Sequence, residues 1–255
     1  MGLWFRDLAR RLAALAGCLL LLGAAPAAAD VVRVAVAANF SETATEIAAA
    51  FKARTGHVAT LSFGSSGQVY AQIAQGAPYQ LLLSGDVERP KQAERAGLGV
   101  AGTRFTYAIG RLVLYSRTPG LVDPAGKVLT AGRFERLAIA DPATAPYGAA
   151  ALATLRGLGV YARVKPRIVI GGSVGQAYQF TASGAAELGF VALSQVAAAT
   201  GGSRWIVPAS LHPPIEQQAI LLAPGRDSAA ARAFLAFLKS PAAQAIIRRH
   251  GYEVG

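Results

Sequence analysis

Strand-like and helix-like segments alternate along nearly the whole chain from residue 31 onward, and this alternation limits the possible folds most strongly. A buried apolar run at 31–38 precedes a helical pattern at 42–54, which Gly56 ends. Further strands are expected at 57–63, 80–85, 104–117, 136–140, 166–170, 187–193 and 215–222, and further helices at 67–75, 87–96, 148–157, 174–183, 227–238 and 241–249. Strands joined by helices predict an α/β protein with parallel sheet.

The composition is that of a folded protein with a large core. The chain has 255 residues, of which 53% are hydrophobic and 15% charged, so disorder is excluded. This length fits one large domain or two smaller ones.

Residues 1–29 have the layout of a cleavable secretory signal. Three arginines precede an apolar run at 12–25, and Ala27-Ala28-Ala29 forms a small-residue cleavage site. "LAGC", ending at Cys18, also looks like a lipidation motif, but the apolar run continues past it, which favours simple cleavage. We therefore expect a periplasmic protein that starts near Asp30 and has no cysteine, hence no disulfide or thiolate site.

The charge is strongly basic but scattered. The net charge is +11, and removal of the signal's three arginines and Asp7 leaves +9. The basic residues are not clustered or interleaved with aromatic residues, so no nucleic-acid partner is expected. A positive field would favour an anionic ligand without proving one.

Small and hydroxylated residues follow most of the predicted strands. These turns are Asn39-Phe40-Ser41, Gly64-Ser65-Ser66-Gly67, Ser84-Gly85-Asp86, 141–148 ("DPATAPYG") and 171–175 ("GGSVG"), and none contains lysine or arginine. Ligands of parallel α/β sheets bind where strands end, and helix N-termini there present unpaired N–H groups. Several converging termini predict a site for a compact anion that uses no cationic side chain.

A simpler interpretation exists for each serine. Ser41 and Ser66 fit as plain N-caps of the helices that follow them. Tyr147, between Pro146 and Gly148, fits a core position as well as a pocket wall. A shared pocket is favoured because small and hydroxylated residues recur at several of these turns.

Two glycine motifs suggest other functions. "GLGVAG" at 97–102 matches a dinucleotide-binding pattern, but it follows a helix, so a plain loop is expected. "GGSVG" places Ser173 as a possible hydrolase nucleophile, with an acid at Glu187 or Asp227 and a base at His212 or His250. No upstream oxyanion segment accompanies it, and His250 fits a helix C-terminus. The three histidines are widely spaced and form no metal-ligand pattern, so neither a metal site nor a cofactor is expected.

The chain resembles the periplasmic molybdate-binding proteins, the solute receptors of molybdenum ABC importers. The resemblance runs from about residue 31 to "GY" at 251–252. It is carried by "AANF" (37–40), "GSSGQVYAQIAQGAPY" (64–79), "RFTYAIGRLVLYS" (104–116), "APYG" (145–148), "SVGQA" (173–177) and "ASGAAELGFVALSQ" (182–195).

The resemblance implies a fold of the type II periplasmic binding proteins, with two α/β lobes, a ligand cleft between them and two crossover strands. We expect the crossings near 105–112 and 210–217. After a signal at 1–29, lobe 1 would comprise 30–108 and 213–255, and lobe 2 would comprise 109–212.

The resemblance also implies the ligand, molybdate or tungstate, and the residues that hold it. Asn39 matches the first contact segment, Ser66 a hydroxyl donor, Tyr147 a phenol donor and Val174 a backbone N–H donor. Ser65 and Ser173 are further candidates.

Two positions depart from the family pattern. Ala38 lacks a hydroxyl that many members have, and Ala192 stands where many have tyrosine. These departures leave the affinity and the choice of anion open.

The function expected is capture of a dianion and its delivery to a membrane ABC permease by a monomer, without catalysis. The alternatives are a receptor for another tetrahedral oxyanion such as sulfate, and a secreted serine hydrolase that uses Ser173.

Overall fold

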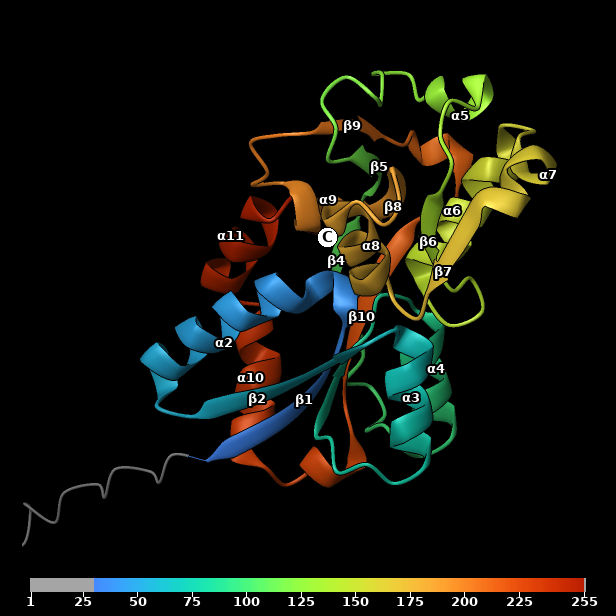
Figure 1. The fold of residues 1–255 in the computed structure, drawn as a ribbon. Helices are drawn as coiled ribbons and strands as arrows, with labels where there is room; N and C mark the ends of the chain where they lie inside the picture. Colours follow the sequence, from blue (N-terminus) through green and yellow to red (C-terminus); the bar gives the residue numbers. More distant parts are fainter. Residues whose placement is uncertain (1–29, 255) are drawn as a thin grey trace, which may run out of the picture.

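The computed structural model describes residues 30–254, and the predicted signal with Cys18 lies outside these residues. Two β-sheets, each with helices packed on it, form two lobes that lie one above the other in Figure 1. Each lobe has its own apolar core, one around Phe40, Phe51 and Phe234 and the other around Leu114, Leu137 and Phe190. The two-lobed α/β architecture expected from the sequence is therefore confirmed.

The sheet of the first lobe has the strand order β2-β1-β3-β10-β4. Their bounds are β1 Val31–Ala37, β2 Val58–Gly64, β3 Leu81–Leu83, β4 Phe105–Gly110 and β10 Ile215–Leu221. Strands β1, β2 and β3 run parallel, whereas β10 is antiparallel to both β3 and β4. The parallel strands end at the same edge, so the turns that follow them face the second lobe.

The sheet of the second lobe has the order β7-β6-β8-β5-β9. Its strands are β5 Leu112–Ser116, β6 Leu137–Ala140, β7 Ile168–Gly171, β8 Leu188–Ala192 and β9 Ser203–Ile206. Strand β6 is parallel to β7 and β8, and β5 is antiparallel to β8 and β9. The sheets are thus mixed, which corrects the expectation of purely parallel pairing.

The chain passes between the lobes at two places. The sequence predicts one long strand at 104–117, but it is two strands, β4 in one sheet and β5 in the other, separated by Arg111. The return lies between β9 and β10. Because Leu112 begins a new sheet directly after Gly110 and Arg111, periodicity alone could not show the break. The exact lobe boundaries, 108/109 and 212/213, stay a prediction.

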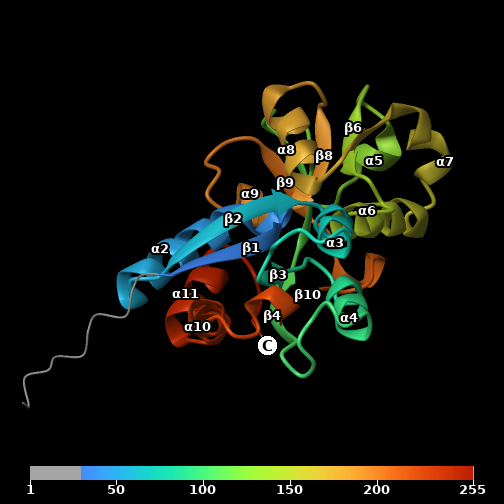
Figure 2. The same cartoon turned by 90° about the horizontal axis from the view of Figure 1, so that it is seen from below.

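Helices pack on both faces of the first sheet. They are α2 Ser41–Thr55, α3 Ser66–Ala74, α4 Glu88–Arg95, α10 Ala229–Leu238 and α11 Pro241–Arg249. Figure 2 shows α2, α10 and α11 on one side of the sheet and α3 and α4 on the other. As predicted, Gly56 ends α2: it has a φ of 78°, and its N–H donates to the Lys52 carbonyl.

The second lobe contains two longer helices that begin at the junction between the lobes. They are α6 Pro146–Gly157 and α8 Val174–Ser183, and shorter helical segments are α5 Val128–Ala131, α7 Tyr161–Val164 and α9 Leu193–Val196. Helices α5 and α7 and strand β9 were not anticipated, because segments of four residues carry little periodic signal. The 3-10 turns of the described chain are η1 Ala38–Phe40, η2 Lys165–Arg167, η3 Ala209–Leu211 and η4 Ala223–Gly225. Within residues 30–254, none of the helices combines the length and hydropathy that a membrane span requires.

An ion-pair cluster joins the last helix to the first. His250 caps the C-terminus of α11, its Nε2 lies 2.8 Å from a Glu46 carboxylate oxygen on α2, and Arg249 pairs with the other oxygen. The hydrogen bond from His250, with support from Arg249, lowers the pKa of Glu46 below its ordinary value of 4.5.

This cluster predicts a pH-dependent contribution to stability. A lowered folded-state pKa stabilises the protein above the ordinary carboxyl pKa, and this stabilisation is lost as the pH falls through the lowered value. We expect Glu46→Gln to have a thermal unfolding midpoint that falls less on acidification than that of the wild type. The effect is small because the Glu46 side chain is 42% exposed. Parallel acid profiles for the two proteins would contradict the assignment.

Candidate functional site

A small cavity lies where the two lobes meet. Its lining comes from both lobes and consists of Ala37, Ala38, Asn39, Ser65, Ser66, Ala145, Pro146, Tyr147 and Val174. Its volume is about 10 Å³, which is enough space for about one water molecule. The site residues predicted from the sequence line this cavity with the exception of Ser173, which directly precedes Val174.

Four helical segments begin at this cavity, and each presents backbone N–H groups without intrahelical partners. These are η1 and α3 from the first lobe and α6 and α8 from the second. Intrahelical bonding starts only with Val69 in α3, Ala149 in α6 and Ala177 in α8. The earlier N–H groups of Ser66, Tyr147 and Val174 are therefore free of helix bonds and carry the positive end of each helix dipole.

The two adjacent serines between Gly64 and Gly67 have different roles. Ser65 is the N-cap of α3: its hydroxyl accepts from the Gln68 N–H at 3.3 Å, and the Gln68 side chain accepts from the Ser65 N–H at 3.1 Å. The Ser66 hydroxyl accepts from the Gly85 N–H at 3.0 Å, and its own hydrogen has no acceptor among residues 30–254. Ser66 is thus the serine with a donor to offer in the cavity, and the interpretation of Ser66 as a plain N-cap is wrong.

The turn before α8 uses the same arrangement. The Ser173 hydroxyl caps the helix by accepting from the Gln176 N–H at 3.2 Å. Val174, the first helical residue, lines the cavity and is 4% exposed. Its contribution can only be the backbone N–H, because its side chain is apolar.

Tyr147 is almost fully buried, with 1% of its surface exposed, and belongs to the core of the second lobe as well as to the cavity wall. Its phenol oxygen lies against Gly110 and has no hydrogen-bond partner in the described part of the chain. Burial raises the pKa of this phenol well above 10.0, so it keeps its hydrogen at any ordinary pH. The Gln217 and Tyr252 side chains lie beside the phenol, but neither completes a hydrogen bond of good geometry with it in the described part of the chain.

The Asn39 side chain is not free for a ligand. Its amide nitrogen donates to the Gln217 carbonyl oxygen at 2.8 Å and to the Tyr252 hydroxyl at 3.0 Å. The Tyr252 hydroxyl lies 2.7 Å from the Asn39 backbone oxygen, and Ser194 of α9 also donates to that oxygen at 2.9 Å. Burial raises the pKa of Tyr252 to about 12. What Asn39 can offer a ligand is therefore the backbone N–H at the start of η1.

Contacts between the lobes close the cavity. The Gly67 N–H donates to the Thr144 carbonyl oxygen across the junction at 2.9 Å. A Cβ atom on Gly67 would lie only 3.1 Å from Thr144, which explains why glycine follows the two serines. The structure therefore represents the lobes in contact around the site.

The lining contains no residue that carries a formal charge. The site thus offers dipolar donors, namely backbone N–H groups and hydroxyls, without acids that would repel an anion. No group of three or more histidine, cysteine, aspartate or glutamate side chains suited to a metal ion occurs in the described part of the chain.

Ala38 lines this cavity and also a neighbouring one of about 120 Å³ bounded by Glu42, Tyr178 and Gln195. A Cβ atom added to Gly175 would come within 3.6 Å of the Ala38 Cβ, which is an ordinary contact distance. The neighbouring cavity provides space for a hydroxyl on residue 38 at the edge of the site. Ala192 is fully buried at the end of β8 and does not line the cavity.

We expect Ala38→Ser to bind a tetrahedral oxyanion about tenfold more tightly, because the hydroxyl adds one hydrogen bond to a charged group. Titration calorimetry measures the change. Ala38→Thr and Ala38→Val form the matched pair, since they differ only in a hydroxyl. Equal affinities for this pair would show that position 38 does not reach the ligand.

The residues of the hydrolase hypothesis are not assembled. Ser173 serves as a helix cap, the Glu187 carboxylate accepts from the Arg136 N–H, and His250 pairs with Glu46. The His212 ring lies against the Pro213 carbonyl at the crossover. No hydrogen bond of residues 30–254 connects Ser173 to a histidine.

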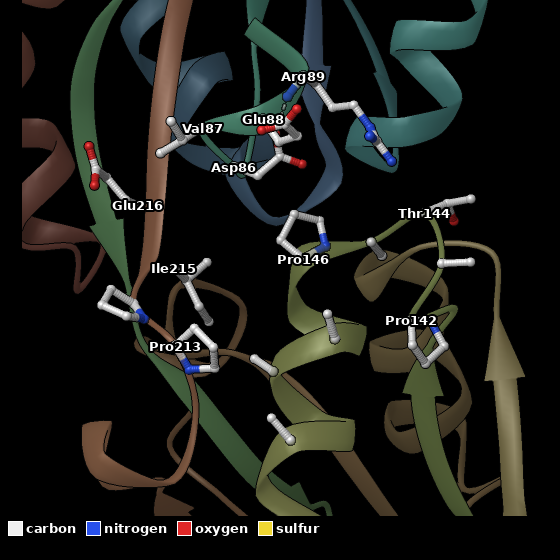
Figure 3. A pocket seen from close by; sticks show the side chains of 17 residues that line it. Asp86, Val87, Glu88, Arg89, Pro142, Thr144, Pro146, Pro213, Ile215 and Glu216 are labelled. Atoms are coloured by element: carbon white, nitrogen blue, oxygen red, sulfur yellow. Dashed lines mark hydrogen bonds between the residues drawn. The ribbon is translucent and has the colours of Figure 1, made fainter. Parts of the chain in front are cut away.

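A larger cavity of about 440 Å³ lies beside the small one, and Figure 3 shows it from close by. Asp86, Glu88 and Arg89 lie along one side and Pro142, Thr144 and Pro146 along the other, with Pro213 and Ile215 of the crossover closing it. It shares Ala145 and Pro146 with the small cavity. Burial raises the pKa of Asp86, and acidic groups make this larger space unsuitable for a dianion.

Residues 32–253 match the family of bacterial extracellular solute-binding proteins. The chain belongs to this family. A solute-binding function agrees with a cavity that lies between two lobes and is lined by residues that carry hydrogen-bond donors.

Two curated relatives of this solute-binding protein are similar over most of their length. The chain is 54% identical to the molybdate-binding protein ModA of Rhodobacter capsulatus over 229 residues, which cover 90% of each chain. It is 49% identical to the molybdate-binding protein ModA of Azotobacter vinelandii, over 91% of this chain and 93% of the relative. The resemblance to the molybdate-binding proteins is thereby confirmed.

Two solved structures have the same fold as this chain. The periplasmic molybdate-binding protein of Azotobacter vinelandii superimposes with a TM-score of 0.85 at 45% identity, covering 88% of this chain and 99% of that one. The sulfate-binding protein SubI of Mycobacterium tuberculosis has a TM-score of 0.72 at 16% identity, covering 88% and 87%, and shows the shared fold alone.

Proposed function

We propose that this chain is a periplasmic receptor that binds molybdate, and by the same chemistry tungstate, and delivers it to an ABC permease in the membrane. The observation that carries the proposal is the convergence of four helix starts and the Ser66 hydroxyl on one neutral cavity. The molybdate-binding relatives support the choice of anion.

The proposed ligand contacts follow from the donors at the cavity. The backbone N–H groups at Asn39, Ser66, Tyr147 and Val174 and the hydroxyls of Ser66 and Tyr147 would each serve an anion oxygen. Desolvating a dianion costs many kcal/mol unless each oxygen receives donors, which this arrangement supplies. Ser65 and Ser173 act by holding the helix starts in place.

Selectivity would have two origins. A protonated phosphate brings a hydrogen that needs an acceptor, and the lining offers donors. Sulfate has the same charge and shape as molybdate but is smaller, so the size of the site would separate the two. At about 10 Å³, the cavity must widen to hold either anion. The permease would recognise the closed lobes. We propose that the receptor works as a monomer, without catalysis and after export.

The test is calorimetric titration of residues 30–255 with molybdate, tungstate, sulfate and phosphate. One-to-one binding of molybdate and tungstate without a sulfate signal is the expected result. Binding of sulfate alone would show that the ligand is sulfate instead of molybdate, and the assignment of the anion site would stand. No binding of any of the four would overturn the receptor, and an esterase assay of the wild type and Ser173→Ala would then test the hydrolase alternative.

Tyr147→Phe tests the phenol directly. We expect molybdate affinity to fall by about 1–3 kcal/mol, or roughly 5- to 150-fold, because a donor to a charged group is lost. Stability without ligand should hardly change or should rise, since the phenol has no partner among residues 30–254. Unchanged affinity in the titration would remove Tyr147 from the site.

A further inference from the structure

We propose that Gln217, which lies outside the cavity, is a positioning residue that orients the Tyr147 phenol for the anion. The proposal deepens the proposed function and rests on it. Gln217 is fully buried in the middle of β10, the strand by which the chain returns to the first lobe.

The carbonyl end of the Gln217 amide is fixed by two donors from the first lobe. The Asn39 amide nitrogen donates to it at 2.8 Å and the Tyr107 hydroxyl at 3.1 Å. The Asn39 amide nitrogen can only donate, so the Gln217 side-chain oxygen faces it, whereas the Tyr107 hydroxyl also lies 3.1 Å from the Ser84 carbonyl oxygen. The same bond holds the Asn39 side chain, and Asn39 belongs to η1 and lines the cavity.

The nitrogen end of the same amide faces the second lobe. A Cβ atom on Gly110 would lie 2.8 Å from the Gln217 nitrogen and 2.1 Å from the Tyr147 phenol oxygen, so these two atoms lie within about 5 Å of each other. Both are buried and neither makes a hydrogen bond of good geometry within residues 30–254, although the phenol lies close to both the Gln217 amide and the Tyr252 hydroxyl. Two polar atoms without partners thus adjoin one another at the meeting point of the lobes.

Hydrogen-bond donors outnumber free acceptors at this point, because the neighbouring Tyr252 hydroxyl is already bonded to Asn39 and Ser194. The Tyr147 phenol carries a hydrogen that its high pKa retains, the Gln217 nitrogen carries two, and the Gln217 oxygen is already used. A bound oxyanion would supply an acceptor for the phenol hydrogen. The phenol oxygen would then accept from the Gln217 nitrogen, and the chain Gln217–Tyr147–anion would polarise the phenol as a donor.

The experiment is a double-mutant cycle of molybdate affinity, with Gln217→Met and Tyr147→Phe made singly and together in the mature protein. Methionine keeps the length of the side chain and removes both polar ends. We expect Gln217→Met to weaken binding about tenfold when Tyr147 is intact and about twofold or less when it is combined with Tyr147→Phe, because Gln217 acts through the phenol. If Gln217 serves only folding, Gln217→Met should lower molybdate affinity by the same factor with and without the Tyr147 phenol. That result would overturn the proposal.

Gln218→Met is the matched control. Gln218 is the next residue of β10, is also buried, and bonds Arg104 and Thr106 instead of the site residues. We expect it to alter the unfolding midpoint but not the affinity. If Gln217→Met fails to fold, Gln217→Leu, which is also apolar and adds no charge near the anion, takes its place in the cycle with the same expectation of non-additivity. Lack of molybdate binding by the wild type would refute the proposed function, whereas full affinity of the Gln217 variants would refute this inference alone.

Discussion

Gly110→Ala is expected to lower molybdate affinity about 10- to 100-fold and to reduce the thermal unfolding midpoint. An added Cβ would lie 2.1 Å from the Tyr147 phenol oxygen and 2.8 Å from the Gln217 nitrogen, both far inside contact distance. Both neighbours are buried, so neither can move without a shift of α6 or β10. Overpacking of this kind costs about 1–3 kcal/mol and here displaces a proposed ligand donor.

Two further variants of this chain provide a control for Gly110→Ala and a partial rescue of its stability. Gly201 has an ordinary φ and no described atom within 4 Å of an added Cβ, so Gly201→Ala should leave affinity and stability unchanged. Tyr147→Phe removes the nearest clashing atom, so its addition to Gly110→Ala should raise the unfolding midpoint again without restoring affinity. Tight binding by Gly110→Ala would show that the packing of Gly110 on Tyr147 is not needed for closure.

Ser66→Ala is expected to weaken molybdate binding about 10- to 100-fold. The hydroxyl is the polar side-chain group of α3 that can donate into the cavity, and a hydrogen bond to a charged group contributes about 1.5–3 kcal/mol. The same oxygen accepts from the Gly85 N–H, which would remain buried without a partner. Calorimetric titration gives the affinity, and thermal unfolding without ligand gives the separate cost of the orphaned N–H.

Ser65→Ala tests whether Ser65 acts as the helix cap while its neighbour Ser66 acts as the ligand donor. Loss of this N-cap should destabilise the protein by about 0.5–2 kcal/mol while affecting affinity less than Ser66→Ala does. The reverse order of effects on affinity would exchange the roles assigned to the two serines.

The order of the main elements could be predicted from the sequence for physical reasons. Short apolar runs followed by amphipathic segments with clear stops, such as Gly56, define strands and helices locally. The helix starts at Ser66 and Val174 could be recognised because small and hydroxylated residues there follow buried strands. Short segments such as β9, and the change of sheet at Arg111, carry no local signal.

The division of roles within the site needed the tertiary structure. The spacing Ser65-x-x-Gln68 is a local signal for Ser65 as the N-cap, but only the structure shows that the Ser66 hydroxyl accepts from the Gly85 N–H, 19 residues away, and keeps its own hydrogen. Asn39 was expected as a contact, but whether its amide is free depends on Gln217 and Tyr252, 178 and 213 residues further along. Two adjacent glutamines in the otherwise apolar centre of β10 were the one signal for Gln217, and periodicity could not show which of them faces the site.

The sequence by itself therefore determined the fold class, the strand–helix turns that could bind an anion and the absence of cationic side chains in those turns, because each depends on residue types close together in the chain. The tertiary structure decided which turns meet, which donors remain free and where an acceptor is missing. These properties depend on pairing between distant residues, since a donor is available to a ligand only when no other part of the chain has already satisfied it.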